Sequence, residues 1–69
     1  MKASNRLRVL RAERRITQLD LALKARITLN RYWRIENGYL NPTPEERERL
    51  ARALRASPGE AFPSVEATA

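Results

Sequence analysis

Residues 16–38 read ITQLDLALKARITLNRYWRIENG, and this stretch decides the fold. Its apolar side chains recur three and four positions apart, which is the spacing of one face of a helix. Thr17 and Thr28 each stand before such a run and are good helix N-caps, and a glycine follows the second run, where a left-handed stop is easiest. We therefore predict two helices, residues 18–24 and 29–37, with a very short connection between them.

A connection this short forces the two helices to cross steeply, so the second helix presents its outer face beyond the first. Such a helix can enter the major groove of DNA, which is about 12 Å wide. Asparagine and arginine offer the paired hydrogen bonds that suit adenine and guanine edges. If Tyr32 and Ile35 face inward, the outer positions are Leu29, Asn30, Trp33, Arg34 and Asn37, with Arg31 at the edge.

Capping signals on both sides of this stretch predict three more helices. Residues 5–15 keep the helical spacing after a possible cap at Ser4 or Asn5. The run Thr43-Pro44-Glu45-Glu46 combines an N-cap, a proline at the first helical position and a capping-box glutamate, and Ser57-Pro58-Gly59-Glu60 repeats that order. We expect the fourth helix to reach about residue 54.

The fifth helix is expected to be short and to end with Phe62 as a plug of the core. The sequence thus predicts an all-α, five-helix domain over residues 1–62, followed by a short flexible tail over residues 63–69. The predicted core residues are Leu7, Leu10, Leu21, Ala22, Ala25, Tyr32, Ile35, Leu50, Ala51, Leu54 and Phe62.

The composition argues against an enzyme. The chain has 69 residues, enough for one small core, and it contains no Cys and no His, which removes thiolate nucleophiles, imidazole bases and the usual zinc ligands. The acidic cluster of Glu45, Glu46 and Glu48 serves the start of a helix better than acid–base chemistry. We therefore expect no catalytic residue, no cofactor and no metal.

The chain also lacks an apolar run of membrane-spanning length and a signal-peptide core. We expect a soluble, cytoplasmic protein without a membrane partner. Its net charge of +6 is uneven, with ten Lys and Arg against two acidic residues up to residue 34, and four Arg against six Glu after it. A one-sided basic field favours a polyanionic partner, because cations that replace condensed counterions on phosphates gain free energy from their release.

Eight short stretches follow the pattern of one known family in register and without a gap, between Leu7 and Phe62. On these residues the sequence resembles the phage-repressor helix-turn-helix family, the Cro- and cI-like domains also called xenobiotic-response-element regulators. The stretches are Leu10-Arg11, Ile16-Thr17-Gln18, Leu21-Ala22, Ile27-Thr28, Arg34-Ile35-Glu36-Asn37-Gly38, Asn41-Pro42-Thr43, Leu50-Ala51 and Ala53-Leu54.

The resemblance implies a compact lambda-repressor-like domain, usually a homodimer, that binds an operator with two half-sites in double-stranded DNA. It also implies a transcriptional regulator, which we expect to be a repressor. By position, Gln18 would bind a phosphate and brace the recognition helix, and an ion pair of Arg11 with Glu36 would orient that helix. The full set expected at the DNA is Gln18, Thr28, Leu29, Asn30, Arg31, Trp33, Arg34, Asn37 and Asn41. Among these, Leu29, Asn30 and Arg34 would meet base edges, and Arg31, Asn37 and the turn around Asn41 would reach phosphates.

The chain departs from the family at two glycine positions, which are occupied here by Arg26 and Arg55. Both positions are expected to need a positive φ, which costs a non-glycine residue on the order of 1 kcal/mol. Two roles are open for Arg26: a phosphate contact that offsets this cost, or a solvated turn residue.

Leu19, Leu23, Leu29 and Trp33 occupy positions that are commonly polar in the family, which predicts exposed apolar surface. Trp33 has three open roles: packing beside Leu29, contact with a thymine methyl or a sugar, or contact with a protein. An alternative function is therefore an antitoxin-like or scaffold module whose protein partner binds at Leu19, Leu23 and Trp33, with DNA binding secondary. A third interpretation is non-specific coating of nucleic acid, which predicts steep salt dependence without a preferred sequence.

Overall fold

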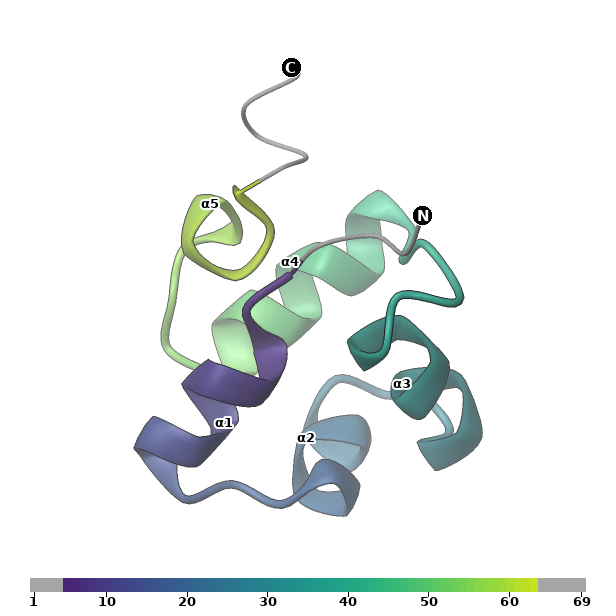
Figure 1. Ribbon diagram of the computed structural model, residues 1–69, viewed down its shortest axis with the longest axis horizontal. Helices are drawn as coiled ribbons and strands as arrows, with labels where there is room; N and C mark the ends of the chain where they lie inside the picture. The colour runs from purple at the N-terminus through teal and green to yellow at the C-terminus, as the bar shows by residue number, and fades with distance from the viewer. Residues whose placement is uncertain (1–4, 64–69) are drawn as a thin grey trace.

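The computed structural model describes residues 5–63, and in this part of the chain all regular structure is helical. The predicted all-α architecture of five helices is confirmed (Figure 1). The helices are α1 (Leu7–Arg14), α2 (Gln18–Lys24), α3 (Leu29–Glu36), α4 (Pro44–Ala53) and α5 (Pro58–Ala61). The proposed cap Ser4 and residues 64–69 of the expected tail lie outside the described residues. None of the described helices is long and apolar enough to cross a bilayer.

Hydroxyl side chains begin four of the five helices, as the sequence predicts. The oxygens of Thr17, Thr28, Thr43 and Ser57 each accept a hydrogen bond from the backbone N–H three residues later, at 3.1 to 3.2 Å. At α4 and α5 the side chain of the capping-box glutamate also accepts a hydrogen bond from the backbone N–H of the N-cap residue. Because these caps satisfy donors that have no partner inside the helix, they fix where each helix starts.

Helix α1 is shorter than predicted at both ends. The Asn5 side chain accepts a hydrogen bond from the backbone N–H of Leu7 at 3.1 Å and donates one to the carbonyl oxygen of Ile35 at 2.9 Å. Asn5 therefore precedes the helix, and it ties the start of α1 to α3. At the other end Arg15 has φ 55°, which stops the helix after Arg14.

The core lies where all five helices meet. Its largest fully buried side chains are Tyr32, Phe62, Leu7, Leu21, Ile35, Leu50 and Leu54. Every residue predicted to face inward is buried, including the Phe62 plug, which is 2% exposed. Burial of these side chains provides most of the favourable free energy of such a small domain.

Four helix ends share one left-handed stop. A residue one or two positions after the last helical residue adopts positive φ: Arg15 (55°), Arg26 (59°), Gly38 (80°) and Arg55 (55°). In each case two successive N–H groups reach back to the last turn; at Arg26 the N–H of Ile27 bonds the carbonyl of Ala22 at 2.9 Å. The positive φ predicted for Arg26 and Arg55 is confirmed, whereas that of Arg15 was not predicted. Glycine adopts this conformation without the steric cost that a Cβ adds.

Candidate nucleic-acid interface

The connection between α2 and α3 has the predicted form. Helix α2 ends at Lys24, Ala25 is fully buried, and the left-handed Arg26 turns the chain so that the buried Ile27 leads into the Thr28 cap of α3. Helix α3 is thus a separate helix that packs on α2, and the two do not form one continuous rod.

The outer face of α3 is exposed where a recognition helix needs exposure. Asn30 and Arg34 are both exposed, while Tyr32 and Ile35 on the opposite face are fully buried. Leu29 is 45% exposed one turn before Trp33. Asn41, in the loop after α3, is exposed as well. The structure therefore leaves Asn30 and Arg34 on the surface, where their side chains can reach base edges.

The Glu36 carboxylate joins three helices beneath this face. Its Oε1 accepts hydrogen bonds from Arg11 Nε and from the Tyr32 hydroxyl, each at 2.7 Å, and its Oε2 accepts one from Gln18 Nε2 at 2.7 Å. The Glu36 side chain is only 1% exposed. The expected pair of Arg11 with Glu36 is thus present, within a larger network that fixes α3 against α1 and α2.

The network shifts the protonation of its members. Burial alone would raise the pKa of Glu36, but hydrogen bonds from Arg11, Tyr32 and Gln18 outweigh it and hold the pKa below its usual value. Burial, followed by the bond to Glu36, raises the pKa of Tyr32. Glu36 is therefore ionised and Tyr32 neutral at neutral pH, which is the pairing that the hydrogen bonds require.

Gln18 occupies the first position of α2 and donates one of its two amide hydrogens to the Glu36 carboxylate. The second hydrogen of the same NH2 group remains to be donated. A phosphate contact and the brace to α3 are therefore compatible in one side chain.

Arg31 lies at the edge of the outer face and forms an ion pair that the sequence did not predict. Its Nε and Nη2 donate to the two carboxylate oxygens of Glu46 on α4, at 2.6 and 2.9 Å. The hydrogen bond from Arg31 holds the pKa of Glu46 below its usual value. Because the Arg31 side chain is still 38% exposed, a phosphate contact through its remaining N–H groups stays a prediction.

Asn37 and Trp33 at the end of α3 are also held by neighbours. The Asn37 side chain accepts from Arg8 Nη2 at 3.0 Å and donates to the carbonyl of Trp33 at 2.9 Å. The Trp33 ring stacks on Tyr39, with centroids 5.6 Å apart and an interplanar angle of 21°. Of the three roles considered for Trp33, local packing is therefore present, but its partner is Tyr39 in the following turn.

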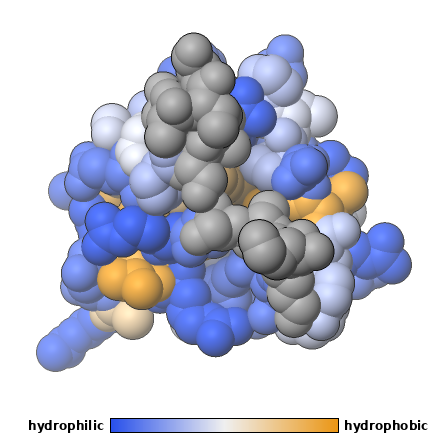
Figure 2. Space-filling view, turned by 45° about the horizontal axis from the view of Figure 1, so that its top comes forward, coloured by the Kyte–Doolittle hydropathy of each residue, from blue (hydrophilic) through white to orange (hydrophobic). Residues whose placement is uncertain are grey.

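The apolar side chains predicted to be exposed on α2 are exposed. Leu19 and Leu23 are 52% and 67% exposed. The face drawn in Figure 2 is mostly hydrophilic, with small separate hydrophobic patches.

Within residues 5–63 there is no group of three acidic, His or Cys side chains that could hold a metal ion. The outer face of α3 presents the amide of Asn30 and the guanidinium of Arg34, and the carboxylates of Glu36 and Glu46 beside it are already paired with Arg11 and Arg31.

Comparison with known proteins agrees with this geometry. A model described as a helix-turn-helix domain matches residues 3–62. The restriction-modification controller protein C.AhdI from Aeromonas hydrophila has a similar structure with a TM-score of 0.76 and 31% identity, over 80% of this chain and 83% of that chain. The clp gene regulator ClgR from Corynebacterium glutamicum has a TM-score of 0.78 at 24% identity, over 90% of this chain and 66% of that chain, and this likeness concerns the fold.

No curated protein matches the chain in sequence. The family match nevertheless covers most of the chain and all five helices, and its residues include the whole of the α2–α3 pair. The resemblance inferred from the sequence is thereby confirmed, and the chain belongs to the helix-turn-helix domain family of DNA-binding regulators, of the xenobiotic-response-element type.

Proposed function

We propose that the chain is a sequence-specific transcriptional regulator that reads double-stranded DNA with α3, and that it acts as a repressor on an operator with two half-sites. The observation that carries the proposal is the exposure of Asn30 and Arg34 on a helix whose opposite face is fully buried. An asparagine can bond adenine at two atoms and an arginine can bond guanine at two atoms, so this pair supplies sequence preference.

The contacts that position α3 are assigned to other residues. Gln18 donates its free amide hydrogen to a phosphate at the start of α2, and Asn41 reaches the backbone from the loop after α3. Thr28, Arg31 and Asn37 lie at the edges of the same face, and Leu29 and Trp33 supply apolar contacts to a thymine methyl or a sugar. Because the Glu36 network fixes α3, these contacts form with little reorganisation of the protein.

The similarity to a restriction-modification controller protein supports control of gene expression as the biological role. We further propose that the protein acts as a homodimer through the surface of α4 and α5, since two copies related by a two-fold axis match a two-fold operator. A regulator of this kind works where the DNA is, so the proposal places it in the cytoplasm. It requires no catalytic step and no cofactor.

The test is equilibrium binding of N30A and R34A to selected duplexes. Each substitution is expected to weaken binding to the preferred sequence by about 1–3 kcal/mol, roughly 5- to 150-fold, and to leave binding to unrelated duplexes nearly unchanged. Arg15→Gly is a matched control, because it removes a charge from the turn after α1, outside the outer face of α3, and glycine tolerates the φ of 55° at that position. Equal losses on preferred and unrelated sequences would contradict the assignment.

A further inference from the structure

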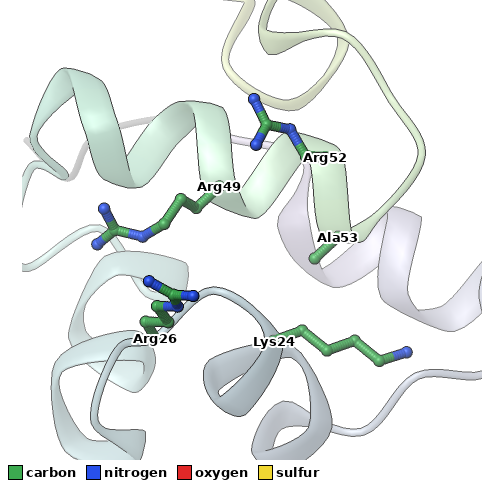
Figure 3. A pocket seen from close by; sticks show the side chains of 5 residues that line it. All are labelled: Lys24, Arg26, Arg49, Arg52 and Ala53. Carbon is green, nitrogen blue, oxygen red and sulfur yellow. The ribbon is translucent and has the colours of Figure 1, made fainter.

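A second basic surface lies away from the outer face of α3. Two adjoining hollows of about 450 and 350 Å³ are present, the first lined by Lys24, Arg26, Arg49, Arg52 and Ala53, and the second by Arg14, Ile16, Lys24, Ala53, Leu54 and Arg55. They share Lys24 and Ala53, and together we call them the basic groove. Its lining comes from the end of α1, from α2 and α4, and from the turns that follow these three helices. Figure 3 shows four cationic side chains around the first hollow, two from α4 and two from the end of α2 and the turn after it.

Five cations of the basic groove have no carboxylate partner within the described part of the chain. The ion pairs formed among residues 5–63 use Arg8, Arg11, Arg14 and Arg31. The side chains left without an ion pair are Lys24, Arg26, Arg49, Arg52 and Arg55. A cluster of like charges opposes folding by mutual repulsion, and a bound anion would relieve that repulsion.

The backbone gives a second, independent observation. Arg26 and Arg55 both line the basic groove, and both hold the left-handed conformation that glycine adopts more easily. Unfavourable backbone conformations concentrate at functional sites, where the side chain serves a purpose other than folding. Favourable interaction of a cation with a helix C-terminus offsets part of the cost. Arg15 has the same conformation at the end of α1 without lining the groove, so it provides a measure of that offset alone.

The lining also indicates the kind of anion. Arginine forms two parallel hydrogen bonds with phosphate, and Arg49 is already oriented by a 2.7 Å bond from its Nε to the carbonyl oxygen of Ala25. Among the described residues no aromatic ring lines either hollow, so they offer a nucleobase no surface on which to stack. In the first hollow the lining offers only Ala53 as an apolar contact, whereas protein partners are held by apolar or aromatic anchors. A chain of phosphates needs neither.

We propose that the basic groove binds the sugar–phosphate backbone of duplex DNA outside the base pairs that α3 contacts. The segment is either a flank of the same duplex or a second duplex, and the chemistry of recognition is the same in both. This inference rests on the proposed function only in that both concern duplex DNA. The groove carries affinity and salt dependence, while Asn30 and Arg34 carry sequence preference.

The experiment compares the parent with the double variant R26G/R55G and with R15G. Each of the three glycine substitutions removes one cation from a left-handed position, but only the two in the double variant lie in the basic groove. Fluorescence anisotropy is measured over a range of salt with duplexes of roughly 20 and 40 base pairs that contain the same selected sequence, about two and four helical turns. In a second arm, an unlabelled duplex without the selected sequence is added to the complex of the protein with the shorter duplex. Sedimentation then shows whether the protein binds both duplexes at once.

The parent is expected to bind the long duplex more tightly than the short one, or to take up the second duplex. R26G/R55G is expected to lose that gain, to bind about tenfold more weakly and to lower the slope of log K against log salt by about 2, close to 0.9 for each lost phosphate contact. R15G should match the parent in the gain and in the slope to within about 1. Since glycine relieves the backbone at these positions, both variants should melt no lower than the parent, so that weaker binding is not caused by unfolding.

The inference is overturned if the double variant and R15G change the slope equally, or if the parent gains nothing from flanking or second duplexes. The two proposals fail separately. If both hold, N30A/R34A loses sequence preference but keeps the gain from flanking or second duplexes, whereas R26G/R55G keeps sequence preference but loses that gain. If only the groove proposal holds, N30A/R34A retains sequence preference, and if only the proposed function holds, R26G/R55G retains the salt slope of the parent.

Discussion

Arg31 on α3 donates two parallel hydrogen bonds to the Glu46 carboxylate on α4, from Nε to Oε2 at 2.6 Å and from Nη2 to Oε1 at 2.9 Å. Oε1 of Glu46 also accepts the backbone N–H of Thr43 at 2.8 Å, so one carboxylate caps α4 and holds the edge of the recognition helix. The loop that carries Asn41 joins α3 to α4, so it lies between Arg31 and Glu46 in the sequence. The position of Asn41, which is predicted to contact a phosphate, thus depends on the Arg31–Glu46 pair.

Glu46→Gln should lower the melting temperature by about 5 °C, because the amide cannot accept both Arg31 bonds and loses the charge that stabilises the N-terminus of α4. Glu45→Gln is the control, since Glu45 is exposed in the same turn of α4. Thermal denaturation followed by circular dichroism measures the difference. Equal melting temperatures for the two variants would contradict the role given to Glu46.

Acid should destabilise the fold through Glu36 and Glu46. Both have a pKa lowered from the usual value of 4.5 in the folded state, so their contribution to stability is complete above about pH 4.5 and is lost as the pH falls through the lower, folded-state pKa. The free energy of unfolding, measured by urea denaturation, should therefore fall below pH 4.5. In Glu46→Gln the fall should be shallower, and a fall of unchanged steepness would show that Glu46 does not contribute.

Two arginines of α1 near Glu36 should differ sharply in their effect on stability. Arg11 is 16% exposed and bonds Glu36 at 2.7 Å, whereas Arg8 is 69% exposed and lies 3.8 Å from the same carboxylate. Arg11→Ala leaves a buried carboxylate without its main partner and should cost about 3 kcal/mol, while Arg8→Ala should cost less than about 0.5 kcal/mol. Urea denaturation measures the free energy of unfolding of both variants. Similar losses in Arg11→Ala and Arg8→Ala would mean that Glu36 is not held chiefly by Arg11.

The left-handed Arg15 should respond differently to glycine and alanine. Both substitutions remove the cation from the end of α1, but alanine keeps the Cβ that opposes φ 55°. Arg15→Gly should therefore unfold with a free energy about 1 kcal/mol higher than Arg15→Ala. At an ordinary helical position the order is reversed, so a more stable alanine variant would show that the left-handed stop is not maintained in solution.

Local signals were sufficient to predict most of the fold. Thr17, Thr28, Thr43 and Ser57 cap their helices through bonds to residues three positions away, and such bonds are legible in the sequence. The spacing of apolar residues predicted which side of each helix is buried for the same reason. Exposure of Asn30 and Arg34 follows from the burial of Tyr32 and Ile35 on the same helix.

Contacts between distant side chains were not predicted by the spacing. The Arg31–Glu46 pair spans 15 positions, and the bond of Gln18 with Glu36 spans 18. Each depends on how two helices cross, which a periodic pattern does not specify. The Arg11–Glu36 pair, 25 positions apart, and a brace from Gln18 to α3 were expected from the family resemblance, but Glu36 was not identified as the partner of Gln18. The left-handed Arg15 was missed because arginine carries no signal for positive φ.

The most direct test of the central claim, that Asn30 and Arg34 read bases from α3, is selection of bound duplexes from a random pool by the parent and by R34A. The parent should enrich a motif repeated with two-fold symmetry, its half-sites about one helical turn apart, and R34A should lose preference at a guanine within each half-site. Enrichment of no motif by the parent, or of an identical motif by both proteins, would contradict the account.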